Sequence, residues 1–136
     1  HEWRPGHLSD AGTFVPLPDY TYEGDVQFLE ACNMAFRKAA LLAVGGFDES
    51  YRGVGDWSEP DVCFRLRAMD RTLHCWFTPR ATLVHRPTTG STTLLRRRDG
   101  DNRLANYRLF SRRWVQPHWR HTIYLWFLQA YYTVRG

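Results

Sequence analysis

Closely spaced cysteines are absent from this sequence, and their absence excludes two common ways of holding a small fold together. The three cysteines stand far apart, form no Cys-x-x-Cys pair and are odd in number: Cys32, Cys63 and Cys75. Structural zinc sites and disulfide frameworks need paired cysteines, so neither is expected, and a reducing compartment is favoured. The 136 residues, 43 % of them hydrophobic, supply enough apolar material for the packed core of one domain.

The sequence also has no apolar run long enough to cross a membrane. Residues 1–5 lack the apolar stretch of a signal peptide and an initiator methionine, so we interpret the chain as part of a longer, cytoplasmic protein. The most apolar segment, 122–133, is too short for a bilayer core of about 30 Å. Flanked by Arg120 and Arg135, it can lie on the inner face of a membrane, pack on another part of the protein or join two chains into a homo-oligomer. All three roles stay open.

Acidic residues are scarce in the last third of the chain. Residues 1–85 hold eight Arg or Lys against twelve Asp or Glu, whereas 86–136 hold ten Arg against Asp99 and Asp101 alone. The first part therefore contains nearly all the carboxylates available for acid–base or metal chemistry. The second part carries a net charge of +8, which suits phosphate, anionic lipid or nucleic acid.

Hydrophobic spacing predicts a small set of helices and strands after an irregular start. Residues 1–25 show no period and are interpreted as a surface loop. Gly45-Gly46 is typical of a helix end, and Ser58 with Asp61 resembles a capping box at a helix start. The expected strands are 26–36, 73–78 and 81–85, and the expected helices are about 37–44, 58–70 and 101–115.

Three segments form an ordered pattern. Residues 31–38 read Ala-Cys-Asn-Met-Ala-Phe-Arg-Lys, 45–49 read Gly-Gly-Phe-Asp-Glu, and 57–61 read Trp-Ser-Glu-Pro-Asp. In this order and spacing, over about 26–90, they resemble the C-terminal half of family-2 glycosyltransferases with the GT-A fold. The resemblance implies an α/β fold class, the C-terminal portion of a Rossmann-like GT-A domain with a few mixed strands and flanking helices. It assigns 26–95 to the acceptor-side, catalytic-base part and 96–136 to a basic helical extension.

The activity implied by the resemblance is inverting sugar transfer from a nucleotide-diphosphate sugar to a hydroxyl of a glycan or lipid-linked acceptor. Glu59 matches the family's general base, which takes the acceptor proton as the oxygen attacks the anomeric carbon. The family commonly has a Glu-Asp pair where this chain has Ser58-Glu59. Taken without the surrounding pattern, Glu59 is an ordinary first-turn helix acid.

The donor side of such an enzyme is expected elsewhere. The family holds a divalent cation (Mg or Mn) through an Asp-x-Asp site in its N-terminal half, and no such site precedes residue 31. Asp99-Gly100-Asp101 matches the Asp-x-Asp pattern, but it follows the basic run 96–98, so it is not expected to be that metal site. The missing N-terminal half of the same protein is therefore expected to be a partner of this chain.

Three further residues are substrate-binding candidates close to the base or the Cys-Asn segment. Trp57 is either a sugar-stacking wall or a core residue, and both interpretations stay open. Asp61 either binds the acceptor or bonds back to the Ser58 amide as a capping residue. Asn33 is expected to point away from the apolar side of its strand, where it can touch donor or acceptor.

Two candidates stand at the end of the last expected strand: His85 is its final residue and Arg86 follows it. His85 corresponds to a family position that reaches the metal or the diphosphate, although a lone histidine is commonly structural. Arg86 is a candidate for binding the diphosphate, together with the run 96–98, and a solvated basic face is the alternative for that run.

Two other functions compete with the enzyme. A non-catalytic module that binds carbohydrate or protein through its aromatic residues, 15 % of the chain, is the main alternative. A nucleic-acid partner is not expected, because it explains the basic last third but neither the Gly-Gly-Phe-Asp-Glu nor the Trp-Ser-Glu-Pro-Asp segment.

Overall fold

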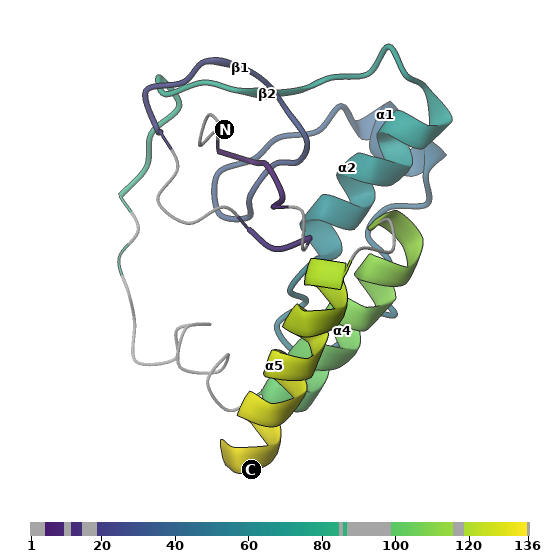
Figure 1. Cartoon of the computed structure of the whole chain (residues 1–136). Coiled ribbons are helices and arrows are strands. Elements are labelled where there is room, and N and C mark those ends of the chain that lie inside the picture. Colours follow the sequence, from purple (N-terminus) through teal and green to yellow (C-terminus); the bar gives the residue numbers. More distant parts are fainter. Residues whose placement is uncertain are drawn as a thin grey trace. The chain divides into compact units, whose positions relative to one another are not determined.

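The computed structural model is of mixed α/β character, which confirms the expected fold class at that level. Its elements follow in the order β1, α1, α2, β2, α4, α5 (Figure 1). The chain divides into two compact units: the first comprises 1–9, 13–48 and 58–85, the second 10–12, 49–57 and 86–136. The structure describes residues 5–9, 12–14, 19–84, 86, 99–115 and 119–135, with side chains in the last range to 131.

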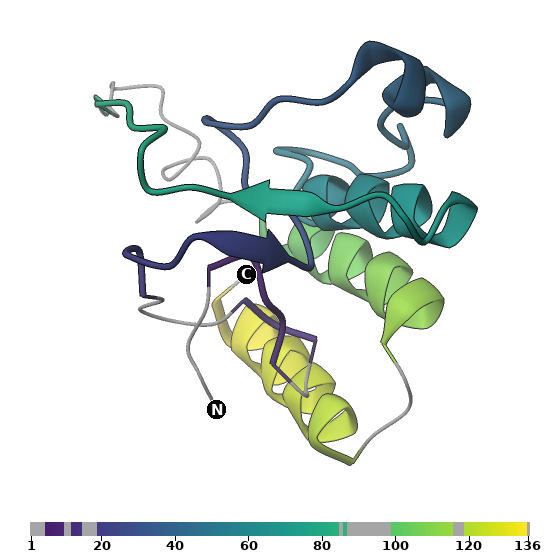
Figure 2. The ribbon, with the colours of Figure 1, turned by 90° about the horizontal axis from the view of Figure 1, so that it is seen from above.

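The first unit contains a two-stranded antiparallel sheet (Figure 2). β1 (Gly24–Val26) pairs with β2 (Cys75–Phe77), and Val26 stands opposite Cys75. Val26 and Cys75 are buried, whereas Trp76 is 60 % exposed, as the alternation of side chains along a strand requires. The sheet therefore directs one face into the core and leaves a tryptophan on the other.

The prediction of a strand over 26–36 is wrong beyond Val26, where β1 ends. The backbone N–H groups of Gln27 and Phe28 both donate to the Gly6 carbonyl, at 2.8 and 3.1 Å. Gly6 has φ of 62°, and a Cβ there would meet the Phe28 carbonyl oxygen at 2.2 Å, so this approach requires glycine. Apolar alternation does not distinguish a paired strand from an extended segment that docks on a loop.

Of the two later strands, the first is confirmed and the second is not. Residues 75–77 of the expected 73–78 form β2, whereas 81–84 form no strand and are exposed. The Ala81 N–H donates to the Thr78 carbonyl at 3.3 Å, which turns the backbone away from the sheet. His85 lies outside the described residues.

The helix expected over 37–44 is confirmed as α1 (Lys38–Ala43), and the two glycines end it as predicted. Gly45 has φ of 77°, in the left-handed region. The Gly46 N–H donates to Leu41 and the Gly45 N–H to Leu42, at 2.9 and 3.0 Å. This pair of bonds is a Schellman motif, which satisfies the last carbonyls of the helix.

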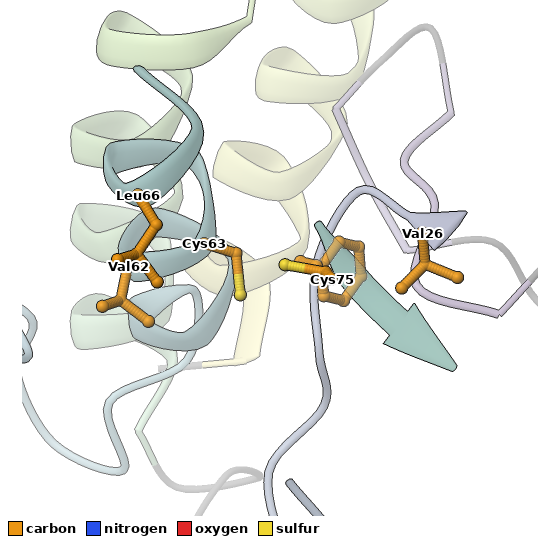
Figure 3. Close-up of a cluster of buried hydrophobic side chains, with 6 residues drawn as sticks. Val26, Val62, Cys63, Leu66 and Cys75 are labelled. Carbon is orange, nitrogen blue, oxygen red and sulfur yellow. The ribbon is translucent and has the colours of Figure 1, made fainter. Parts of the chain in front are cut away.

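The helix expected over 58–70 is confirmed as α2 (Ser58–Met69), which supplies half of the core of the first unit. The buried cluster is shown in Figure 3 and consists of Val26, Phe28, Val62, Cys63, Leu66 and Cys75. Cys63 and Cys75 are free thiols. The hydrogen bond to Cys75 and burial both raise the pKa of the Cys63 thiol, which therefore stays protonated as a small core residue.

The second unit is built on two helices, α4 (Gly100–Trp114) and α5 (Trp119–Arg135), which pack on each other. α4 confirms the helix expected over 101–115. The segment 49–57 is held on α4 by hydrogen bonds to two α4 side chains. Asn106 exchanges two hydrogen bonds with the Arg52 backbone, both at 2.9 Å, and Arg103 Nε donates to Asp56 at 2.8 Å.

No helix in the part of the chain that the structure describes has the length and apolar character needed to cross a bilayer.

Candidate functional site

Glu59 lies in the first turn of α2, on the first unit. The helix begins at Ser58, and the Ser58 Oγ donates to Glu59 Oε2 at a long 3.4 Å. The side chain is partly exposed, so a substrate hydroxyl can reach it. A carboxylate on a helix start is held on a rigid support while remaining open to solvent. This placement is compatible with a general base, as the resemblance implies.

Asp61 has a different environment from Glu59 although it stands only two residues later. Its side chain is fully buried, and Arg65 Nε donates to Asp61 Oδ2 at 2.7 Å. The same guanidinium donates to the carbonyls of Val44 and Gly46, just beyond the end of α1. Asp61 therefore orients an arginine that ties α2 to the end of α1, which favours a structural role over acceptor binding.

Trp57 belongs to the second unit and is 7 % exposed. Its ring packs against Tyr107 and Phe110 of α4, with centroid distances of 5.0 and 5.3 Å. Sugar stacking needs an open ring face. The structure thus favours the core interpretation of Trp57 over the sugar-stacking one.

Backbone strain marks both motif segments. Among the described non-glycine residues, Cys32 and Trp57 have positive φ, 78° and 80°. A non-glycine residue in this region costs about 1–2 kcal/mol, and such conformations cluster at binding and catalytic sites. The two residues belong to the Ala-Cys-Asn and Trp-Ser-Glu segments, so the geometry points to the same segments as the sequence pattern.

Replacing Cys32 with glycine should raise the free energy of unfolding by about 0.5–1 kcal/mol. The Cys32 side chain is exposed, so the change removes strain without removing core packing. Urea denaturation measures the difference. Ala39→Gly, at an exposed position of α1, is the control and should lower stability by about 1 kcal/mol. Equal destabilisation by both changes would show that the turn at Cys32 is not strained.

The first unit has an open cleft of about 700 Å³ beside the Cys32 turn. Asn33 lies in its wall, and the Asn33 Nδ2 donates to the Ala81 carbonyl at 2.6 Å, which joins the turn to the segment after β2. Tyr20 and Trp76 also line the cleft and are 59 and 60 % exposed. Glu59, on the same unit, is not among the lining residues, so the cleft and the proposed base are separate features.

Glu30 is a cleft residue that the sequence pattern did not identify as functional. It lines the wall next to the Cys32 turn, where desolvation raises the pKa of its carboxyl although the residue as a whole is exposed. A carboxyl with a raised pKa in a cleft is a candidate acid or base. The signal in the sequence is an acidic residue on the apolar side of the strand expected over 26–36.

The expected metal and diphosphate ligands are not assembled in the described part of the chain. His85 and the run 96–98 lie outside it, and Arg86 is an exposed residue. Over the described residues no three His, Cys, Asp or Glu side chains are grouped so that they could hold a metal ion. Asp99 accepts hydrogen bonds from Val54 and Asn102, a structural role at the start of α4. The described residues thus do not fit a divalent cation.

Comparison with models of known protein families, with characterised proteins and with solved structures found no match to this chain. Its function is therefore inferred from its own residues and geometry.

Proposed function

We propose that this chain is the acceptor-side part of an inverting nucleotide-sugar glycosyltransferase of GT-A type, with Glu59 as the general base. The observation that supports the proposal most is the positive φ of Cys32 and Trp57. Both residues lie in the segments whose order resembles that family, and strain of this kind persists where the surrounding fold maintains a particular site geometry.

The proposed reaction requires one proton transfer on this chain. The Glu59 carboxylate accepts the proton of an acceptor hydroxyl while the hydroxyl oxygen forms a bond to the anomeric carbon. The bond from that carbon to the diphosphate oxygen breaks on the opposite face, so the configuration inverts. The donor and any divalent cation are assigned to the proposed N-terminal half, as the resemblance to the family implies.

The cleft of the first unit is proposed to hold a sugar unit of the acceptor. The rings of Tyr20 and Trp76 offer exposed apolar faces of the kind that stack on sugar rings. Asn33 already donates to Ala81, so its Oδ1 remains able to accept from a sugar hydroxyl.

One observation favours a second function, a carbohydrate-binding module without catalysis. The aromatic cleft does not include Glu59 in its lining, so it could bind a glycan with no chemistry following. The two functions differ in turnover, because a binding module holds a glycan and releases no nucleoside diphosphate.

A transfer assay separates these functions. Two samples are compared: a longer polypeptide that contains residues 1–136 together with the proposed nucleotide-binding half, and residues 1–136 alone. Each is incubated with a panel of nucleotide sugars, and the release of nucleoside diphosphate is measured. With the longer polypeptide, we expect nucleoside diphosphate to be released only when an acceptor glycan is added. With residues 1–136 alone, we expect no release. Release by residues 1–136 alone would show that the donor site is misplaced. Glycan binding by the longer polypeptide without release would favour the binding module.

A further inference from the structure

α5 is apolar on two faces, and α4 covers only one of them. Its inner face packs on α4 through His121 and Tyr124, whose rings lie 5.7 and 5.3 Å from the Tyr107 ring. Figure 1 shows the two helices side by side. A helix that is apolar around most of its circumference is normally covered on all of its apolar surface.

The second apolar face of α5 forms a continuous exposed stripe. Its residues follow helical spacing of three and four, and their exposed fractions are high: Trp119 62 %, Ile123 46 %, Trp126 75 %, Phe127 70 % and Tyr131 49 %. Isolated exposed apolar residues need no explanation, but a contiguous stripe of this kind marks an interaction surface.

The composition of the stripe favours a membrane surface over a second protein helix. Helices that pair with one another usually present Leu, Ile or Val along the seam. Here four of the five stripe residues are aromatic, and two are tryptophans. Tryptophan and tyrosine, with an apolar ring and a polar tip, concentrate at the boundary between lipid headgroups and acyl chains.

The charges around α5 are complementary to anionic headgroups. No Asp or Glu occurs after Asp101, so α5 carries no acid. Arg112 and Arg113 lie in the last turn of α4 and Arg120 in the first turn of α5, and all three are exposed. Exposed arginines beside an apolar stripe are the pattern of helices that lie in the plane of an anionic bilayer surface.

We propose that α5 docks the protein on an anionic membrane surface, with the stripe from Trp119 to Tyr131 buried at the boundary between headgroups and acyl chains. Phosphate-bearing lipid headgroups meet the arginines at the α4–α5 connection. The helix lies in the surface and does not cross the bilayer. This docking does not depend on Glu59 or on the cleft, so it stands or falls independently of the proposed activity.

Vesicle sedimentation tests the docking. Residues 1–136 are mixed with vesicles of phosphatidylcholine alone, or of three parts phosphatidylcholine to one part phosphatidylglycerol. We expect sedimentation with the anionic vesicles, weakened severalfold by raised salt, because screened arginines contribute less. The double change Trp126→Ser with Phe127→Ser should lower partitioning at least about tenfold, because both rings lose their apolar burial.

Two further variants make the result specific to the stripe. Leu42→Ser with Met69→Ser removes exposed apolar side chains from the first unit and should bind vesicles like the parent. Trp126→Leu with Phe127→Leu keeps the stripe apolar and should retain most of the binding, which also shows that loss in the serine variant is not misfolding. Unchanged binding by the serine variant, or equal binding to uncharged vesicles, would overturn the proposal. Concentration-dependent dimerisation through the stripe, with no vesicle binding, would assign it to a second copy instead.

Discussion

Replacing Asp61 with asparagine is expected to lower the free energy of unfolding by about 3 kcal/mol. The substitution keeps the shape of the side chain and removes its charge, so the Arg65 guanidinium loses the fully buried carboxylate that it contacts at 2.7 Å. Removing one partner of a buried ion pair costs about 3–5 kcal/mol, and the low end applies because the Arg65 side chain is 22 % exposed. Urea denaturation followed by circular dichroism measures the difference.

The first unit offers a matched control for this change. Glu23 and Arg80 form an ion pair with the same 2.7 Å separation, but the Arg80 side chain is 81 % exposed. Solvent screening leaves such a pair little net energy, so Glu23→Gln should leave stability nearly unchanged. If Asp61→Asn and Glu23→Gln had equal small effects, Arg65 would not depend on Asp61 to tie α2 to the end of α1.

If the proposed function holds, replacing Glu59 with glutamine should reduce sugar transfer by about 10²–10⁴-fold in a polypeptide that carries this chain and the proposed nucleotide-binding half. Glutamine keeps the size of the side chain but cannot accept the acceptor proton. KM for the acceptor should change little, because the cleft that is proposed to hold it does not include Glu59. The measurements are kcat, KM and the pH profile of kcat/KM, whose acid limb should disappear in the variant.

Glu30→Gln is the control for this experiment, because it makes the same chemical change on the same unit. Glu30 lines the cleft, and desolvation raises the pKa of its carboxyl, so it is a second candidate acid or base on this unit. We expect Glu30→Gln to keep most of kcat. A loss of transfer in Glu30→Gln, with near-parent transfer in Glu59→Gln, would move the base from Glu59 to Glu30.

The helices were predictable because their signals are local. The glycines after α1 and the Ser-Glu-Pro-Asp start of α2 act within one turn of backbone, so the observed bounds agree closely with the expected ones. The prediction of a strand over 26–36 was wrong because the pairing of strands depends on residues far apart in the sequence. The backbone of this segment docks on Gly6, more than twenty residues earlier, and no alternation of side chains encodes that contact.

The environments of the candidate site residues were not predictable from the sequence. Sequence order alone does not predict that the segment 49–57 belongs to the same unit as the last third of the chain. As a result, Trp57 and Glu59 lie in different units. Glu30, Tyr20 and Trp76 are far apart in the sequence, and only folding brings them together in the lining of one cleft.

The sequence by itself determined where the helices lie and which part of the chain is basic. These properties depend on residue type and on neighbours within a few positions. Only the tertiary structure decided that Asp61 is buried against Arg65 and that Trp57 is covered by α4, while Glu59 stays partly open. Burial depends on side chains brought together from distant positions, so three residues within five positions of one another have three different environments.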